Sequence, residues 1–302
     1  MSEFYSNGKL LLTGEYLVLD GGLALAVPTK FGQSLSVSKT DKPTISWESL
    51  DHESKSWFSM ELKISDVISG KNSSSNEIET RLKSILHQAY KLNPDFLNSG
   101  IGYDVKSNLS FPRYWGLGTS STLINNIANW ANVDAFKLLD KTFGGSGYDI
   151  ACAGSRMPIL YSLKNGHAEI SKVDFNPTFK EELYFVYLNK KQNSRDGISQ
   201  YKALNDSVEK ELEALNSLTQ LILASTSLEE FSTLITAHEN LISSLIRLKP
   251  VKEELFDDFK GAIKSLGAWG GDFVLAASHS DPSDYFKNKG YDTVIPYIKM
   301  VL

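Results

Sequence analysis

The feature that most constrains the fold of this chain is a glycine turn placed directly in front of a helical pattern. Residues 116–121 read GLGTSS, and strand-like residues 103–105 precede them. Backbone N–H groups that glycines leave accessible at the start of a helix form a concave cluster of donors, to which the helix dipole adds positive potential. The pattern therefore predicts a strand, an anion-binding turn suited to phosphate, and a helix whose buried face carries Leu123, Ile124, Ile127, Ala128 and Ala131.

The hydroxyl groups of this turn allow a simpler interpretation, in which Thr119, Ser120 and Ser121 cap the helix and bind nothing. Two further glycine-rich turns favour ligand binding. Residues 144–149 read GGSGYD and put the carboxylate of Asp149 directly after a flexible turn, and residues 267–272 read GAWGGD between a helix and a strand. Three such turns, each at a junction of regular elements, exceed what hairpins require.

The first half of the chain alternates strand and helix patterns. Short Leu- and Val-rich runs between residues 9 and 37 predict strands separated by tight turns. The polar residues 69–76 predict a loop, and the spacing of apolar residues over 78–90 predicts an amphipathic helix. Residues 157–188 then return to strand character, so this part of the chain predicts an α+β domain.

The second half is richer in helix. Residues 200–266 predict a long helical stretch, and the chain is expected to end in a strand near residues 273–276. The composition changes near residue 175, and the length suits two domains. We therefore predict an N-terminal domain over residues 1–175 and a C-terminal domain over residues 176–302.

Charge and cysteine content exclude several classes of partner. Lys plus Arg number 31 and Asp plus Glu 36, a net charge of −5, which gives no basic surface for nucleic acid. The single Cys152 allows no internal disulfide, no Cys/His zinc spacing is present, and Cys152 is interpreted as a small buried apolar residue. The N-terminus has no secretory pattern, and Glu15 and Asp20 interrupt the most apolar stretch, so we expect a cytoplasmic protein that does not cross a membrane.

Several catalytic motifs are absent from the sequence. No glycine-lysine pair is followed by Ser or Thr as in a Walker A loop, Ser121 stands where a dinucleotide fingerprint requires glycine, and no GxSxG elbow occurs. The five histidines are scattered, and we interpret all of them as surface or helix-face residues.

Three segments together resemble the motifs of the GHMP kinase superfamily. Residues 6–21, SNGKLLLTGEYLVLDG, are similar to its first motif; residues 116–120 resemble its GLGSS phosphate loop; and residues 267–272 resemble its C-terminal GAGGGD turn. The order and the spacing match over nearly the whole chain. The resemblance implies an N-terminal domain like domain 2 of ribosomal protein S5, a ferredoxin-like C-terminal domain, and binding of ATP and substrate between them.

Within the superfamily the likeness is greatest to the mevalonate and phosphomevalonate kinases. Residues 145–151, GSGYDIA, are similar to the GSGFDVA run of the latter, and Tyr16 and Asp272 also match the latter. The resemblance implies ATP-dependent phosphorylation of a small hydroxy- or phospho-acid, with phosphomevalonate ahead of mevalonate. Two alternatives stay open: a non-catalytic sensor that binds ATP and ligand, and an ATP-dependent decarboxylase of mevalonate diphosphate.

The resemblance also implies roles for individual residues. Asp149 would accept or orient the substrate proton, Lys9 would stabilise charge on the transferring phosphoryl group, and the Ser120 hydroxyl would coordinate Mg²⁺. The simpler interpretations are a turn-forming Asp149 and a solvated Lys9. The residues expected at the phosphates of ATP are Gly116, Leu117, Gly118, Thr119, Ser120 and Ser121, and those expected at the small-molecule substrate are Glu15, Tyr16, Ser146, Gly147, Gly270 and Gly271.

The chain departs from the superfamily pattern at two places. Relatives supply a glutamate to Mg²⁺ from the helix before the GYDIA run, whereas this chain has Lys137, Asp140 and Lys141 there, so its second metal ligand is open. Trp269 replaces a glycine of the third motif and is expected either to narrow the pocket or to form a stacking wall. A monomer and a homodimer are both compatible with the sequence.

Overall fold

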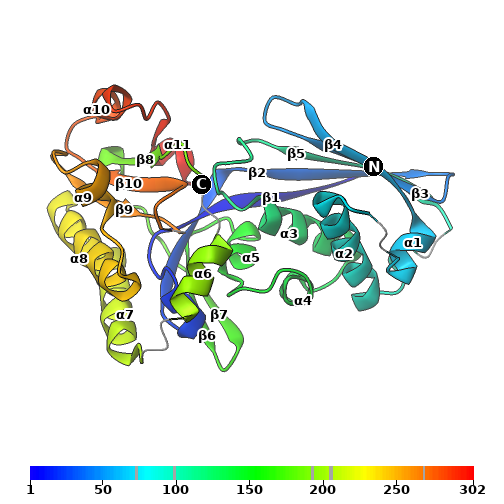
Figure 1. The fold of residues 1–302 in the computed structure, drawn as a ribbon, viewed down its shortest axis with the longest axis horizontal. Coiled ribbons are helices and arrows are strands. Elements are labelled where there is room, and N and C mark those ends of the chain that lie inside the picture. Colours follow the sequence, from blue (N-terminus) through cyan, green and yellow to red (C-terminus); the bar gives the residue numbers. More distant parts are fainter. Residues whose placement is uncertain (72–73, 98–99, 192–193, 204–206, 268) are drawn as a thin grey trace. The chain divides into compact units, whose positions relative to one another are not determined.

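The structure is a computed structural model that describes the 302 residues apart from 72–73, 98–99, 192–193, 204–206 and 268. The chain forms two compact units that interleave along the sequence (Figure 1). The division of the chain into an N-terminal domain over residues 1–175 and a C-terminal domain over residues 176–302 stays a prediction. Unit 1 contains Met1–Gly8, Phe31–Arg113 and Leu117–Gly154, and unit 2 contains Lys9–Lys30, Tyr114–Gly116 and Ser155–Leu302.

A long strand, β2 (Ala24–Thr40), contributes to both units. Its first residues pair antiparallel with β6 (Ile159–Lys164) of unit 2, and its later residues pair antiparallel with β5 (Gly102–Leu109) of unit 1. The strand order is β4-β3-β5-β2-β6-β7, with β1 also paired to β2, and the sheet is mixed because β3 and β5 run parallel. The other strands are β1 (Ser2–Leu11), β3 (Thr44–Leu50), β4 (Ser56–Lys63) and β7 (His167–Lys172).

In unit 1, helices gather on one face of the strands (Figure 1). The predicted helix over residues 78–90 is confirmed as α2 (Glu77–Leu92), whose N-cap Asn76 accepts hydrogen bonds from the N–H groups of Ile78 and Glu79. Its apolar residues join a core that also includes Trp47 of β3. The remaining helices of this unit are α1 (Ile64–Ser69), α3 (Thr119–Ala131), α4 (Ala135–Asp140) and α5 (Tyr148–Ala153).

Unit 2 contains a second, antiparallel sheet of four strands in the order β11-β8-β10-β9. Every residue of β8 (Leu183–Tyr187), β9 (Ala262–Ser265) and β10 (Phe273–Ala277) is buried, as expected for strands covered on both faces. The other elements are η1 (Leu17–Asp20), η2 (Lys180–Glu182), α6 (Ser194–Lys202), α7 (Glu209–Ala224), α8 (Leu228–Ile246), α9 (Val251–Leu255), α10 (Ser283–Asn288), β11 (Val294–Pro296) and α11 (Tyr297–Met300).

Two expectations about the second half of the chain are wrong. Strand β9 interrupts the stretch expected to be helical, because a buried run of four residues has the same apolar pattern as the end of a helix. The strand expected to end the chain is β10, but α10, β11 and α11 follow it, and each is too short to give a clear period. The expected α+β class is confirmed. Among the described residues, no helix has the length and apolar character that crossing a bilayer requires.

Candidate active site

The predicted phosphate turn leads into α3 without a side-chain cap. Gly116 and Gly118 have φ of 68° and 92°, and Gly118 is the N-cap of α3, where it offers no side chain. The Ser121 hydroxyl donates to the carbonyl of Gly118 at 2.9 Å, and the Ser120 side chain is exposed. The simpler interpretation of a helix capped by hydroxyl groups therefore does not describe Ser121. The first N–H groups of a helix have no acceptor within it, so this end of α3 suits an anion.

Gly116, the first residue of the turn, is contacted by two charged side chains of unit 2. The Nζ of Lys9, on β1, donates to the Gly116 carbonyl at 3.3 Å. The carboxyl group of Asp272 packs against the Cα of Gly116, so closely that a Cβ on residue 116 would overlap with it. Burial and the charge of Asp272 raise the pKa of Tyr187 to about 12. The turn thus begins at a glycine that leaves no space for any side chain.

Asp149 lies in the first turn of α5, which begins after the second glycine-rich turn. Gly145 and Gly147 have φ of 105° and 86°, and Gly147 is the N-cap of α5. The Asp149 side chain is half-buried, and its Oδ1 accepts a hydrogen bond from the N–H of Ile150 at 3.0 Å. This bond and the buried Ile150 hold the carboxylate at the start of the helix.

Glu15 and Tyr16 of the first motif are both buried in unit 2. Glu15 is 1% exposed and its carboxylate receives a hydrogen bond from Lys264. The Tyr16 hydroxyl accepts the backbone N–H of Trp269 at 3.3 Å, and its ring stacks on Tyr201 with centroids 5.6 Å apart. The substrate contacts implied for Glu15 and Tyr16 stay predictions, since in this arrangement both side chains contact protein.

The third motif is held by packing of its tryptophan. Trp269 is buried, and its Nε1 donates to the Lys249 carbonyl at 3.2 Å, so in this structure the indole belongs to the core cluster around Tyr16. Gly270 follows with a φ of 81°, and Gly271 is buried. Residue 268 of this motif lies outside the described residues.

Three residues without a predicted role surround Glu15: His238 and Glu239 on α8, and Lys264 on β9. His238 Nε2 accepts the N–H of Gly14 at 3.2 Å. The separation of 249 residues between Lys264 and Glu15 hides their contact from any local pattern. The one signal in the sequence is a lysine within an otherwise apolar and small-residue strand, which requires a buried partner.

The predicted site residues therefore form two groups, each described within its own unit. Unit 1 holds Ser120, Asp149 and their neighbours in the two turns, and unit 2 holds Lys9 and Gly116. The described parts of the chain contain no group of three or more His, Cys, Asp or Glu side chains arranged for a metal ion. The other predicted site residues are Leu117, Gly118, Thr119, Ser121, Ser146 and Gly147 in unit 1, and Glu15, Tyr16, Gly270 and Gly271 in unit 2.

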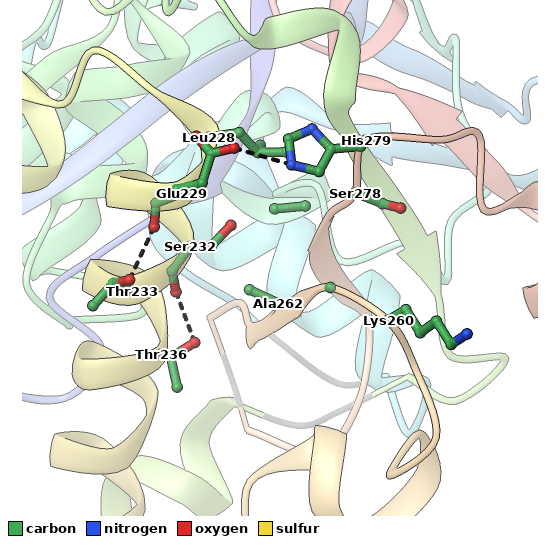
Figure 2. Close-up of a pocket in the computed structure, with 11 residues that line it drawn as sticks. Leu228, Glu229, Ser232, Thr233, Thr236, Lys260, Ala262, Ser278 and His279 are labelled. Carbon is green, nitrogen blue, oxygen red and sulfur yellow. Dashed lines mark hydrogen bonds and ion pairs between the residues drawn. The ribbon is translucent and has the colours of Figure 1, made fainter.

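Figure 2 shows a pocket elsewhere in unit 2, beside the first turns of α8 and the ends of β9 and β10. His279 lies at its rim, with its Nε2 3.1 Å from a carboxylate oxygen of Glu229. None of the predicted site residues lines this pocket, so we assign it no part in the candidate active site.

Solved structures of several small-molecule kinases are similar to this chain. Mevalonate kinase of Methanococcus jannaschii has a TM-score of 0.72 at 18% identity, over 97% of this chain and 96% of that chain. Streptococcus pneumoniae phosphomevalonate kinase, in complex with phosphomevalonate and AMPPNP, has a TM-score of 0.70 at 19% identity, with 96% of both chains covered. Lactococcus lactis galactokinase, complexed with galactose, has a TM-score of 0.66 at 14% identity, over 95% of this chain and 88% of that chain. Neither a protein-family model nor a curated protein sequence matches this chain.

These comparisons define the class of fold. The chain has the α+β fold of the GHMP kinases over almost its whole length, as its three motifs imply. Identities below 20% define the fold alone, and the three kinases act on different acceptors by name. The activity of this chain therefore depends on its own residues.

Proposed function

We propose that this protein is a kinase that transfers the γ-phosphoryl group of ATP to a small hydroxy- or phospho-acid. The observation that carries the proposal is the start of α3, where Gly116 and Gly118 have positive φ and Gly118 offers no side chain as a cap. Backbone donors and the helix dipole would bind phosphate there without a large side chain in the way. The fold shared with known kinases supports the same reading.

The exposed Ser120 fits the role of a magnesium ligand. Its oxygen is of the type that Mg²⁺ prefers, and Mg²⁺ usually takes few protein ligands and completes its shell with phosphates and water. When bound, the ion would neutralise charge on the phosphates. Helix α4, from which relatives supply a glutamate, has Lys137 and Asp140 in this chain, so Asp140 is the acidic residue available there.

Asp149 and Lys9 would supply the charged groups of the reaction. In phosphoryl transfer the protein contributes mainly by positioning the reacting groups and by stabilising charge on them. Asp149, whose Oδ1 is fixed by the N–H of Ile150, would orient the acceptor hydroxyl or phosphate and take its proton. Lys9, whose ammonium group lies at the Gly116 carbonyl, would stabilise negative charge on the transferring group.

Among acceptors we place phosphomevalonate ahead of mevalonate. This choice rests on the resemblance of residues 145–151, Tyr16 and Asp272 to the phosphomevalonate kinases. The likeness to the Streptococcus pneumoniae phosphomevalonate kinase adds support, and the similar likeness to a mevalonate kinase keeps both acids in the test.

A coupled assay of ADP release tests the proposal. We expect turnover above the ATP blank with phosphomevalonate or mevalonate when Mg²⁺ is present, in a panel that also contains homoserine and hexoses. No turnover with any acceptor, together with retained ATP binding, would support the sensor alternative. Release of CO₂ from mevalonate diphosphate would support the decarboxylase.

A further inference from the structure

The backbone at Tyr16 adopts a strained conformation. Tyr16 has φ 61° and ψ −53°, and the N–H of Leu17 donates to the carbonyl of Glu15 at 2.6 Å. This is a γ-turn with positive φ at its centre, a form that is rare for a residue with a side chain. Such conformations persist only where the surrounding structure holds them, and they cluster at functional sites.

Two buried side chains hold the residues before the γ-turn. His238 Nε2 accepts the N–H of Gly14 at 3.2 Å, and Lys264 Nζ donates to Glu15 Oε1 and, at 2.8 Å, to the Ser265 carbonyl. The side chains of His238, Lys264 and Glu15 are fully buried. Helix α8 and strand β9 thus fix one amide and one carboxyl group directly beside the strained residue.

Burial and one hydrogen bond together indicate the protonation state of His238. Burial lowers the pKa of His238 well below its ordinary value, so its imidazole is neutral. Because Nε2 accepts the Gly14 N–H, the proton of His238 lies on Nδ1, and its 3.5 Å approach to Glu15 Oε2 is not an ion pair. Lys264 is then the cation that faces both Glu15 and Glu239, and Glu239 accepts the N–H and hydroxyl of Ser265 at 2.9 and 2.8 Å.

On the other side of the γ-turn, Tyr16 contacts the third glycine-rich turn. Its hydroxyl accepts the Trp269 N–H at 3.3 Å, and its ring is held by stacking on Tyr201. Trp269 directly precedes Gly270 and Gly271. A change in the γ-turn would therefore move the acceptor on which the Trp269 amide depends.

We propose that His238 and Lys264 are positioning residues that hold the γ-turn at Tyr16, and that Tyr16 in turn fixes the third glycine-rich turn through the Trp269 amide. Neither His238 nor Lys264 needs to touch a ligand for this role. The expected effect on catalysis rests on the proposed kinase function, whereas the expected effect on the backbone does not.

Amide hydrogen exchange in the full-length protein, labelled with ¹⁵N-Gly and ¹⁵N-Trp, tests the backbone effect. In His238→Leu the Gly14 N–H loses its acceptor, and we expect Gly14 and Trp269 to exchange about 10- to 100-fold faster, after correction for global stability. His238→Gln offers an amide oxygen as acceptor and should restore slow exchange. His167→Leu, an exposed histidine on β7, serves as the matched control and should change neither amide.

Steady-state kinetics test the link to the site. If Gly270 and Gly271 bind the acceptor, His238→Leu and Tyr16→Phe should raise the KM for the acceptor by about 10-fold, and kcat and the KM for ATP should change much less. His238→Gln should recover the KM. Loss of stability alone would lower the active fraction and would not separate the two KM values.

Three results would overturn the proposal. The first is unchanged exchange at Gly14 in His238→Leu, and the second is an equal acceleration in the Leu and Gln variants. The third needs no variant: ¹⁵N spectra of the wild-type imidazole at pH 6 should show a neutral ring protonated on Nδ1, and an imidazolium or an Nε2–H tautomer would contradict the geometry. None of these depends on turnover, so failure of the proposed function and failure of this inference can be told apart.

Discussion

Asp149 is half-buried and has a fixed orientation, because one carboxylate oxygen accepts the Ile150 N–H. Asp149→Asn keeps the size of the side chain and one amide oxygen for this bond but removes the negative charge. We expect the chemical step to slow by roughly 10²- to 10⁴-fold, the usual range for general acid–base assistance, with ATP binding and the melting temperature nearly unchanged. Single-turnover rates and thermal unfolding measure both.

The control for this variant is Asp104→Asn, an exposed carboxylate on β5. Lys9→Met should slow the same step, and the double variant with Asp149→Asn should lose less than the product of the single losses, because groups that act together are not additive. A near-normal rate for Asp149→Asn, or a rate lost only together with the melting temperature, would show that this aspartate is structural.

Ser120 is exposed at the start of α3, so Ser120→Ala would remove the proposed oxygen ligand and leave the backbone donors in place. We expect turnover to fall much more than ATP affinity, with part of the loss recovered at high Mg²⁺ concentration. The measurement is a titration of turnover against Mg²⁺, with Ser121→Ala as the matched variant because the Ser121 hydroxyl already donates to Gly118. Identical magnesium dependence for wild type and Ser120→Ala would reject the ligand role.

Gly116 has a φ of 68° and lies against the Asp272 carboxyl group. An alanine at this position would therefore have an unfavourable backbone conformation, and its Cβ would overlap with Asp272. We expect Gly116→Ala to destabilise the protein by about 1–3 kcal/mol and to weaken ATP binding, because the turn must shift away from Asp272. Gly166→Ala is the control, since Gly166 has a φ of 76° with open space around it. Chemical unfolding and ATP titration compare the two, and equal effects would mean that the overlap with Asp272 is unimportant.

At the scale of elements, the packing of α8 and β9 around the first motif makes stability depend on pH in two opposing ways. Burial raises the pKa of Glu15 from 4.5 to about 7, against the opposing charge of Lys264, so the stability this group contributes is present below pH 4.5 and lost as pH rises through 7. Burial lowers the pKa of His238 well below 6.5, so its contribution is present above pH 6.5 and lost as pH falls. Between pH 4.5 and 6.5 the falling contribution of Glu15 and the rising contribution of His238 to the free energy of unfolding oppose each other.

Replacing His238 should leave the pH dependence of stability that Glu15 contributes. In His238→Gln the free energy of unfolding should fall by roughly 3 kcal/mol between pH 4.5 and 7.5, since each unit of pKa shift corresponds to about 1.4 kcal/mol. Urea unfolding at several pH values measures the change. Adding Glu15→Gln should flatten most of the profile, with a remainder from Glu239, whose pKa burial also raises. If the free energy of unfolding of His238→Gln depended on pH as it does in the wild type, the opposite pKa shifts of Glu15 and His238 would be contradicted.

The same elements show what the sequence can and cannot predict. Helix α2 and the glycine-opened α3 follow from local periodicity and local turn chemistry, so both were accessible from the sequence. The pairing of His238 with Gly14 joins residues 224 positions apart, and no local pattern carries such information. Strand β9 was missed for a related reason, because its burial comes from neighbours such as α8 and β10 rather than from its own short sequence.

At the scale of the whole molecule, the fold is shared with kinases at 14–19% identity. A fold at this level of identity is compatible with several acceptors, and with loss of catalysis. The proposed activity therefore depends on the glycine turn before α3, on Asp149 and on Lys9.

Phosphoryl transfer by this protein can be followed directly by ³¹P NMR of a reaction that contains the protein, ATP, Mg²⁺ and phosphomevalonate or mevalonate. We expect resonances of ADP and of a newly phosphorylated acceptor to grow together, in equal amounts, and both to be absent with Asp149→Asn on the same timescale. ADP that accumulates with free inorganic phosphate and an unchanged acceptor, or no loss of ATP with either acid, would rule out the proposed phosphoryl transfer.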